Sequence, residues 1–228
     1  MTRALRLIIF DVDGTLVDSQ GLIATCMIKA FEATSRVAPE PKNVKDIIGL
    51  SLPKAFEQLC PSANAQERRN LTEAYISAVM ATRETQSEQI SSPLYPGIRS
   101  LLDSLLRFPE TLMGVATGKS WRGLDHVIRA HGFEQHFVTC QVADNHPSKP
   151  HPSMILTALS ETGCDAAQAV MVGDTVYDMQ MAAAAGIAAV GVNWGYHDKA
   201  RLQEAGAQHI AMDADHLAQI LQNLDTGR

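Results

Sequence analysis

The sequence predicts an α/β protein whose core is a doubly wound (Rossmann-like) parallel sheet, with an all-helical cap domain inserted into it. From about residue 94 onward, short apolar runs bounded by Gly, Asp or Thr alternate with amphipathic stretches. Between about residues 19 and 92 there is no convincing strand, and the pattern is helical. We therefore expect residues 1–16 and 94–228 to form the α/β core and residues 17–93 to form the cap.

The expected core strands are continuous apolar runs, which is typical of a parallel sheet covered on both faces. They lie at residues 5–10, 112–116, 169–172 and 187–192. The stretches between them carry apolar residues at helical spacing. These stretches predict helices at residues 121–130, 153–160, 176–185 and 199–205.

The inserted block is expected to contain helices at residues 21–35, 53–59 and 66–82. Ser51 precedes Leu52 and Pro53, so it is a plausible N-cap with proline inside the first turn. The chain is expected to return to the core through a linker at residues 91–97, which is rich in serine and proline.

The composition and charge of the chain argue against some classes of binding partner. The chain has 228 residues and a formal net charge of −6, with no run of Lys or Arg. This balance argues against nucleic acid and anionic membranes as partners. The four cysteines form no C-x-x-C pair, which favours reduced thiols in a cytoplasmic protein. The apolar run at residues 7–10 is too short for a signal peptide, and no other segment approaches the length of a membrane span.

Two carboxylates, Asp11 and Asp13, directly follow the first apolar run. Spacing by two in an extended chain points both side chains the same way, and open α/β sheets bind ligands at the carboxyl ends of their strands. Two like charges side by side are unfavourable unless a cation lies between them or they share a proton. An acidic strand end that merely caps the next element is disfavoured, because Gly14 and Thr15 continue the pattern.

A second acidic pair, Asp174 and Asp178, follows the run at residues 169–172. Spacing by four brings Asp178 back towards Asp174 if a helix starts here. Taken alone, either acid is equally well interpreted as a helix N-cap. Two acidic strand ends in one parallel sheet, however, form an oxygen-only site of the kind that Mg²⁺ prefers.

Two further signals are weak when taken alone. Thr117 and Gly118 lie where a strand runs into a helix start, and a hydroxyl with free backbone N–H groups binds phosphate oxygens well there. Strand-to-helix turns often carry Thr and Gly without such a role. Lys149 lies in a proline-flanked loop, where a lone lysine is most often solvated surface. A functional role for Lys149 is favoured only by the order in which the other motifs appear along the chain.

That order resembles the motif series of the haloacid dehalogenase (HAD) superfamily. The matching segments are Asp11–Thr15, Thr117-Gly118, Lys149-Pro150 and Gly173–Asp178, with further similarity at residues 95–97 and 191–196. The matched frame runs from residue 7 to about residue 210. The helical block is similar to the small cap of the phosphoglycolate-phosphatase-like branch. These motifs are very specific for the superfamily and much less specific for a substrate.

The resemblance implies a Mg²⁺-dependent phosphatase. Asp11 would attack phosphorus and form an aspartyl-phosphate. Asp13 would protonate the leaving alcohol and then deprotonate the hydrolytic water. Thr117 and Lys149 would complete the catalytic set and, with Gly118, bind the phosphoryl oxygens. The Mg²⁺ ligands would be Asp11, the Asp13 backbone carbonyl and Asp174, with Asp178 close by or bonded through water.

The presence of an acid at Asp13 separates this chain from the dehalogenases, because a halide leaving group needs no proton. The expected substrate is a small phosphate monoester, phosphoglycolate or similar, and Lys54 in the cap would meet a second anionic group on it. Many phosphoglycolate phosphatases have Asn where this chain has Gly118, which weakens the assignment of that substrate. A solvated Lys54 is an equally good interpretation.

Two alternatives remain open. A sugar-phosphate mutase similar to β-phosphoglucomutase would share every catalytic residue, although such mutases often carry a β-branched apolar residue in place of Thr15. A binding module without catalysis would be expected to have lost at least one of the site residues. The sequence does not indicate an oligomeric state.

Overall fold

Six parallel strands form one sheet in the order β3-β2-β1-β4-β5-β6 in the computed structural model, which describes residues 5–224. The strands are β1 (Arg6–Phe10), β2 (Thr111–Thr117), β3 (Thr139–Val142), β4 (Ala169–Gly173), β5 (Ala188–Val192) and β6 (His209–Ala211). The chain moves outward from β1 to β3 and then resumes on the other side of β1. The order therefore reverses between β1 and β4, which confirms the predicted doubly wound, Rossmann-like sheet.

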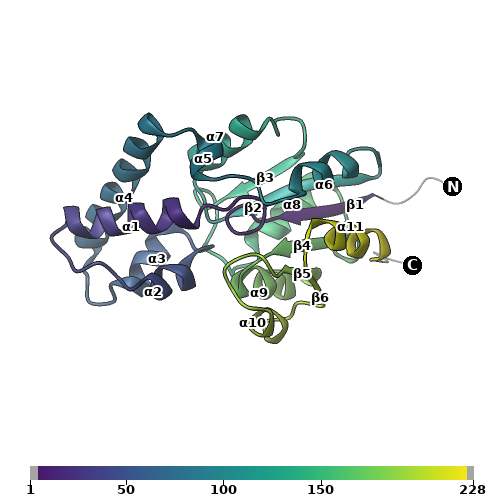
Figure 1. The fold of residues 1–228 in the computed structure, drawn as a ribbon. Helices are drawn as coiled ribbons and strands as arrows, with labels where there is room; N and C mark the ends of the chain where they lie inside the picture. Colours follow the sequence, from purple (N-terminus) through teal and green to yellow (C-terminus); the bar gives the residue numbers. More distant parts are fainter. Residues whose placement is uncertain (1–4, 225–228) are drawn as a thin grey trace.

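Both faces of the sheet are covered by helices, because each buried strand points alternate apolar side chains in opposite directions. In β1, Ile8 and Phe10 pack with α6 (Ile98–Leu105), α7 (Trp121–His131) and α11 (Ala214–Asn223). Leu7 and Ile9 pack on the other face with α8 (Ser153–Thr162), α9 (Val176–Ala185) and α10 (Lys199–Glu204). Figure 1 shows these helices around the strands in the right-hand part of the molecule.

Five helices lie between β1 and α6; the first four form a separate block to the left in Figure 1, and the short fifth helix packs on α7. They are α1 (Gln20–Ala33), α2 (Pro41–Ile47), α3 (Leu52–Leu59), α4 (Ala65–Thr85) and α5 (Glu88–Ser91). Apolar side chains of α1 to α4 form a core of their own around Phe56. Asn64 and Glu67 form a capping box that fixes the start of α4. We refer to this block as the cap.

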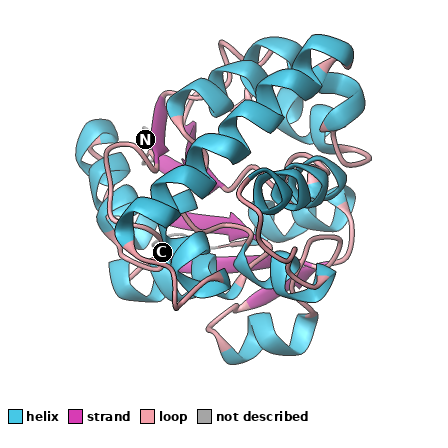
Figure 2. Cartoon of the chain, turned by 90° about the vertical axis from the view of Figure 1, so that its left-hand side faces the viewer, coloured by secondary structure: helices cyan, strands magenta, loops and turns pink. Residues whose placement is uncertain are grey.

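The two connections between cap and core run side by side. The backbone N–H of Asp18 donates to the carbonyl of Pro93 at 2.8 Å, and that of Tyr95 donates to the carbonyl of Leu16 at 3.0 Å. This pairing places the cap beyond the carboxyl end of β1 (Figure 1), and Figure 2 views the molecule from the side on which the cap lies in Figure 1. The exact limits of the cap, residues 17–93, stay a prediction.

All four expected strands and all seven expected helices are present, with ends shifted by a few residues at most. The sequence did not reveal β3 and β6, which are short, nor α2, α5, α6 and α11. Pro41 does not interrupt helical structure but occupies the first turn of α2, where a missing N–H is harmless. Ser51 occupies the N-cap of α3, but its side chain makes no capping hydrogen bond. Within residues 5–224, no helix combines the length and apolar character needed to cross a bilayer.

Candidate active site

Three predicted site residues lie at the carboxyl ends of three adjacent strands. Asp11 directly follows β1, Thr117 is the last residue of β2, and Asp174 directly follows β4. The Asp11 backbone N–H donates to the carbonyl of Val172 in β4 at 2.9 Å, which fixes the start of this loop against its neighbour. The site therefore lies at the point where the strand order reverses, the usual ligand-binding position in open α/β sheets.

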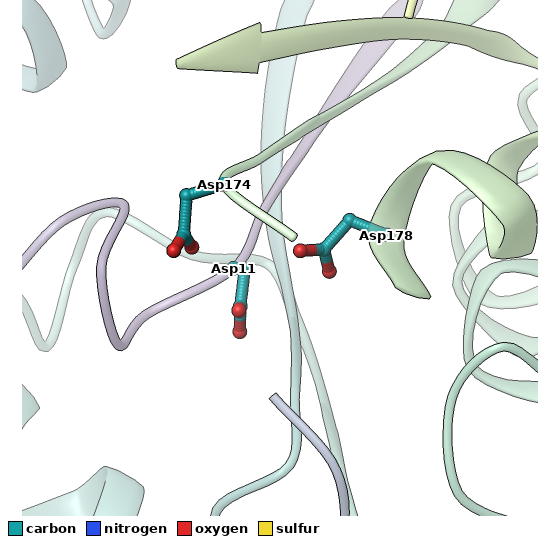
Figure 3. Close-up of side chains that lie close together, drawn as sticks. All are labelled: Asp11, Asp174 and Asp178. Carbon is teal, nitrogen blue, oxygen red and sulfur yellow. The ribbon is translucent and has the colours of Figure 1, made fainter. Parts of the chain in front are cut away.

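Asp11, Asp174 and Asp178 form a compact group of buried carboxylates. One oxygen from each lies within 4.8 Å of the others, and no side chain of the three is more than 1% exposed. Figure 3 shows the three carboxylates pointing towards one another from the end of β1, the end of β4 and the first turn of α9. The spacing of four therefore brings Asp178 back to Asp174, as the sequence predicted.

Hydrogen bonds hold two of these carboxylates in place. Asp174 accepts from the Thr15 hydroxyl and from the Tyr196 backbone N–H, both at 2.9 Å. Asp178 accepts from the backbone N–H and the hydroxyl of Thr175, at 3.1 and 2.7 Å. Asp178 therefore completes a capping box with Thr175, which is the N-cap residue of α9, while a metal-binding role for Asp178 stays a prediction. In contrast, the carboxylate of Asp11 accepts no hydrogen bond from a backbone N–H or a hydroxyl of the described residues.

Lys149 is the cation of this group. It is only 1% exposed, and its Nζ lies 2.9 Å from Oδ1 of Asp11 and 2.6 Å from Oδ1 of Asp178. Burial acts to lower the pKa of Lys149, but the two carboxylates outweigh it and raise that pKa above its ordinary value. The lysine is therefore a fixed positive charge beside Asp11 and not a solvated surface residue.

One lysine does not balance three carboxylates. Burial raises the pKa of Asp11, the Lys149 charge opposes this, and the charges of Asp178 and Asp13 add to it, giving a value of about 7. Burial, followed by the charges of Asp11 and Asp178, raises the pKa of Asp174 well above its ordinary value. A group of three carboxylates with excess negative charge, in which Oδ2 of Asp11 has no partner among the described residues, fits a hard divalent cation such as Mg²⁺.

Asp13 points into a different set of contacts. Its carboxylate accepts a hydrogen bond from the Ser19 hydroxyl and lies 2.8 Å from Nζ of Lys119. Ser19 in turn lies 3.2 Å from the hydroxyl of Tyr196. Asp13 is not part of the carboxylate trio, in keeping with the expected use of its backbone carbonyl for a metal.

Sequence reasoning missed Lys119, Ser19 and Tyr196. Lys119 directly follows Thr117-Gly118, and this adjacency was the one available signal. Ser19 lies beyond the motif that contains Asp13, and Tyr196 is brought to the site by the loop after β5. Thr117 is fully buried and accepts a hydrogen bond from the Lys119 backbone N–H at 3.3 Å.

A cavity of about 330 Å³ opens between the cap and the core beside Asp13, Gly118 and Lys119. The backbone of the cap loop at Gly49 and Leu50 approaches Gly118 so closely that a Cβ atom there would lie 2.6 and 2.7 Å from their carbonyl oxygens. Gly118 is therefore the residue that lets the cap loop reach the site. The Asn of relatives would not fit in this arrangement.

Lys54 is not brought to the site. It lies on α3, its side chain is 48% exposed, and it pairs with Glu57 at 2.9 Å. It is not among the described residues that line the cavity. The structure therefore favours the interpretation of Lys54 as a solvated helix residue.

Comparisons with known proteins agree with the geometry of the site. The model of the family described as haloacid dehalogenase-like hydrolase matches residues 8–192. The chain is 38% identical over 206 residues to the protein named "Probable phosphatase IndB" of Dickeya dadantii, covering 90% of this chain and 88% of that one. It is 29% identical over 226 residues to a phosphoglycolate phosphatase of Haemophilus influenzae, covering 97% and 100%.

A solved structure supports the fold. A hydrolase from Pseudomonas syringae superimposes with a TM-score of 0.83 at 23% identity, covering 96% of this chain and 98% of that chain. Similarity at this level of identity concerns the fold and not the substrate.

Proposed function

Because the chain belongs to the haloacid dehalogenase-like hydrolase family, in the branch of the phosphoglycolate phosphatases, we propose that it is a Mg²⁺-dependent phosphatase acting through an aspartyl-phosphate. Family membership confirms the resemblance drawn from the motifs. The observation that carries the proposal is the position of Asp11, which is buried, lies 2.9 Å from Nζ of Lys149 through Oδ1, and has no partner for Oδ2 among the described residues.

In the first step, an oxygen of Asp11 attacks phosphorus, and the bond from phosphorus to the ester oxygen breaks. The protonated Asp13 gives its proton to the departing alcohol. In the second step, water attacks the phosphorus of the aspartyl-phosphate and gives a proton to Asp13, which releases inorganic phosphate and restores Asp11. The transition state is loose, so positioning and charge neutralisation supply most of the rate enhancement.

The chain's own charges support this chemistry. Lys149 places a positive charge against the nucleophile and the phosphoryl oxygens. Thr117 and the backbone at Gly118 are positioned to hold the remaining oxygens. Lys119 and Ser19 orient the Asp13 carboxylate.

Asp11, Asp174 and the Asp13 backbone carbonyl would hold Mg²⁺, with Asp178 nearby. When bound, this ion offsets the negative charge of the phosphoryl group and the carboxylates. Asp178 already accepts from Thr175 and contacts Lys149, so its main task is to orient the lysine.

The direct test is release of phosphate from p-nitrophenyl phosphate with Mg²⁺ and with excess chelator. Mg²⁺-dependent release supports the phosphatase, whereas no release under either condition supports the non-catalytic binding module. The mutase alternative is tested with a hexose 1-phosphate. Its conversion to the 6-phosphate without phosphate release would replace the phosphatase assignment.

Phosphoglycolate is the first physiological ester to test, because several relatives carry its phosphatase name. We place the enzyme in the cytoplasm, since its four cysteines are all free thiols, and a reducing compartment keeps them so.

A further inference from the structure

We propose that the cavity under the cap selects a phosphate monoester whose alcohol part is predominantly apolar and several carbons long. This inference rests on the proposed phosphatase function and specifies its substrate class. It places the phosphoryl group beside Asp11 and the organic group in the space between α1, α4 and the cap loop.

The walls of the cavity are apolar on the cap side. The lining residues include Leu22, Ile23 and Met27 from α1 and Ile76, Val79 and Met80 from α4. Residues Ile47 to Leu50 and Leu52 extend the same surface towards the core. The cavity ends at Asp13, Gly118 and Lys119, so it is continuous with the candidate active site. A group held in it would therefore be the part of the substrate attached to the ester oxygen.

The charged residues on the lining leave little for a second anionic group to bind. Lys119 pairs with Asp13 at 2.8 Å, and Arg83 pairs with Glu88 at 3.0 Å. Arg122 is exposed, and its guanidinium lies 3.7 Å from the sulfur of Met80. Among the described lining residues, no buried cation is without an acidic partner. Arg122 is the one described lining cation without an acidic partner, and its exposure to water weakens its attraction for a carboxylate such as that of glycolate.

The volume of the cavity also favours a substrate with an apolar group of several carbons. A cavity of about 330 Å³ lies at the lower end of the range for small-molecule sites, which bury most of the surface of their ligands. A two-carbon group would leave most of the apolar lining in contact with water. A chain or ring of about six carbons would cover it and gain the free energy of apolar burial.

A series of n-alkyl phosphates from ethyl to hexyl, together with 2-phosphoglycolate, tests this directly. The alkyl leaving groups differ little in acidity, so differences in kcat/KM report binding of the chain. We expect kcat/KM to rise about threefold for each added methylene until the cavity is filled. Ethylphosphonate and hexylphosphonate, titrated calorimetrically in the presence of Mg²⁺, should show the same order in Kd without turnover.

Substitutions of lining residues test whether the cavity causes the preference for longer alkyl chains. Met80→Gln and Ile76→Gln place polar groups on the lining at positions that are 39% and 44% exposed, so the fold should tolerate them. We expect each to lower kcat/KM for hexyl phosphate about tenfold and to change ethyl phosphate less than twofold. Ile28→Gln on α1 is the matched control, because Ile28 is 39% exposed and is not among the described lining residues.

The outcomes separate this inference from the proposed function. A flat alkyl series, or phosphoglycolate as the best substrate of the set, would overturn the apolar assignment while leaving the phosphatase intact. Equal effects of the control and lining variants on hexyl phosphate would also overturn it. Failure to hydrolyse any ester, including p-nitrophenyl phosphate, in the presence of Mg²⁺ would overturn both.

Discussion

The ammonium group of Lys119 lies 2.8 Å from the carboxylate of Asp13, on the side of the site that faces the cap cavity. Lys119 is thus tied to the residue proposed to transfer protons. Lys119 belongs to the core, at the start of the segment that leads into α7. Its partner Asp13 is not one of the three carboxylates of the trio. The carboxylate of Asp13 and the trio of Asp11, Asp174 and Asp178 are therefore held by different side chains.

Replacing Lys119 with Met is expected to lower kcat for an alkyl phosphate by about ten- to a hundredfold, the value of one charge-assisted hydrogen bond. The loss for p-nitrophenyl phosphate should be smaller, because its leaving group needs less help from Asp13. Lys119→Arg should recover part of the activity. Lys29→Met, an exposed lysine of α1, is the control. Equal losses for both esters would show that Lys119 acts on the phosphoryl group and not through Asp13.

Asp11→Asn should remove turnover, by at least about 10³-fold, while the circular dichroism spectrum stays unchanged. An amide is a poor nucleophile, and the Asp11 side chain accepts no hydrogen bond from the backbone of the described residues, so the fold should not depend on its charge. Asp165→Asn, at an exposed position without a side-chain capping bond, should be fully active. If Asp11→Asn keeps activity within a few-fold of wild type, in protein whose new asparagine has not deamidated back to aspartate, Asp11 is not the nucleophile.

Asp13→Ala should affect substrates unequally. Phosphorylation should be slowed most for an alkyl ester and least for p-nitrophenyl phosphate, and hydrolysis of the aspartyl-phosphate should be slowed for both. Single-turnover mixing should then show a burst of p-nitrophenol followed by slow turnover. If both esters lose the same factor and no burst appears, Asp13 is a structural residue.

Mg²⁺ should raise the melting temperature. At a concentration of about 100 times Kd, the stabilisation is about 2.7 kcal/mol, which corresponds to several degrees for a chain of this size. Burial and the neighbouring charges bring the pKa of Asp11 to about 7, so protons compete with the ion, and the shift should shrink as the pH falls from 8 to 6.

Asp174→Asn should abolish most of this thermal shift. Ca²⁺ should support little turnover, because its longer bonds and larger ligand number would misalign Asp11. Full activity in excess chelator, or a shift that Asp174→Asn leaves unchanged, would rule out the proposed metal scheme.

Gly118→Ala should lower kcat/KM by about ten- to a hundredfold for all esters, because the new methyl group would displace the cap loop at Gly49 by a fraction of an ångström to an ångström. Gly21→Ala is the control: no atom would lie within 4 Å of its Cβ, it is not among the described lining residues of the cavity, and its activity should change less than twofold. Unchanged activity of Gly118→Ala would show that close approach of this loop is not needed for turnover.

The sequence by itself determined the sheet, the inserted helical block, and the identities of Asp11, Asp13, Lys149 and Asp174. The sheet and the three aspartates follow from local patterns, because a buried strand is a continuous apolar run and parallel strands bring their carboxyl ends to one edge, whereas Lys149 was identified only from the order of the motifs. The short strands β3 and β6 were not predicted, because three or four residues carry too little periodicity to distinguish a strand from a loop.

Only the tertiary structure decided which residues complete the site. Ser19, Lys119 and Tyr196 reach it from three distant segments, and no spacing rule relates them. The structure also separated Lys119, which meets Asp13, from Lys54, which lies on the exposed side of α3. The physical reason is that the side of a helix facing the active site is fixed by packing of the cap against the core. The same packing creates the apolar cavity, so substrate preference is a property of the assembled molecule and not of any motif.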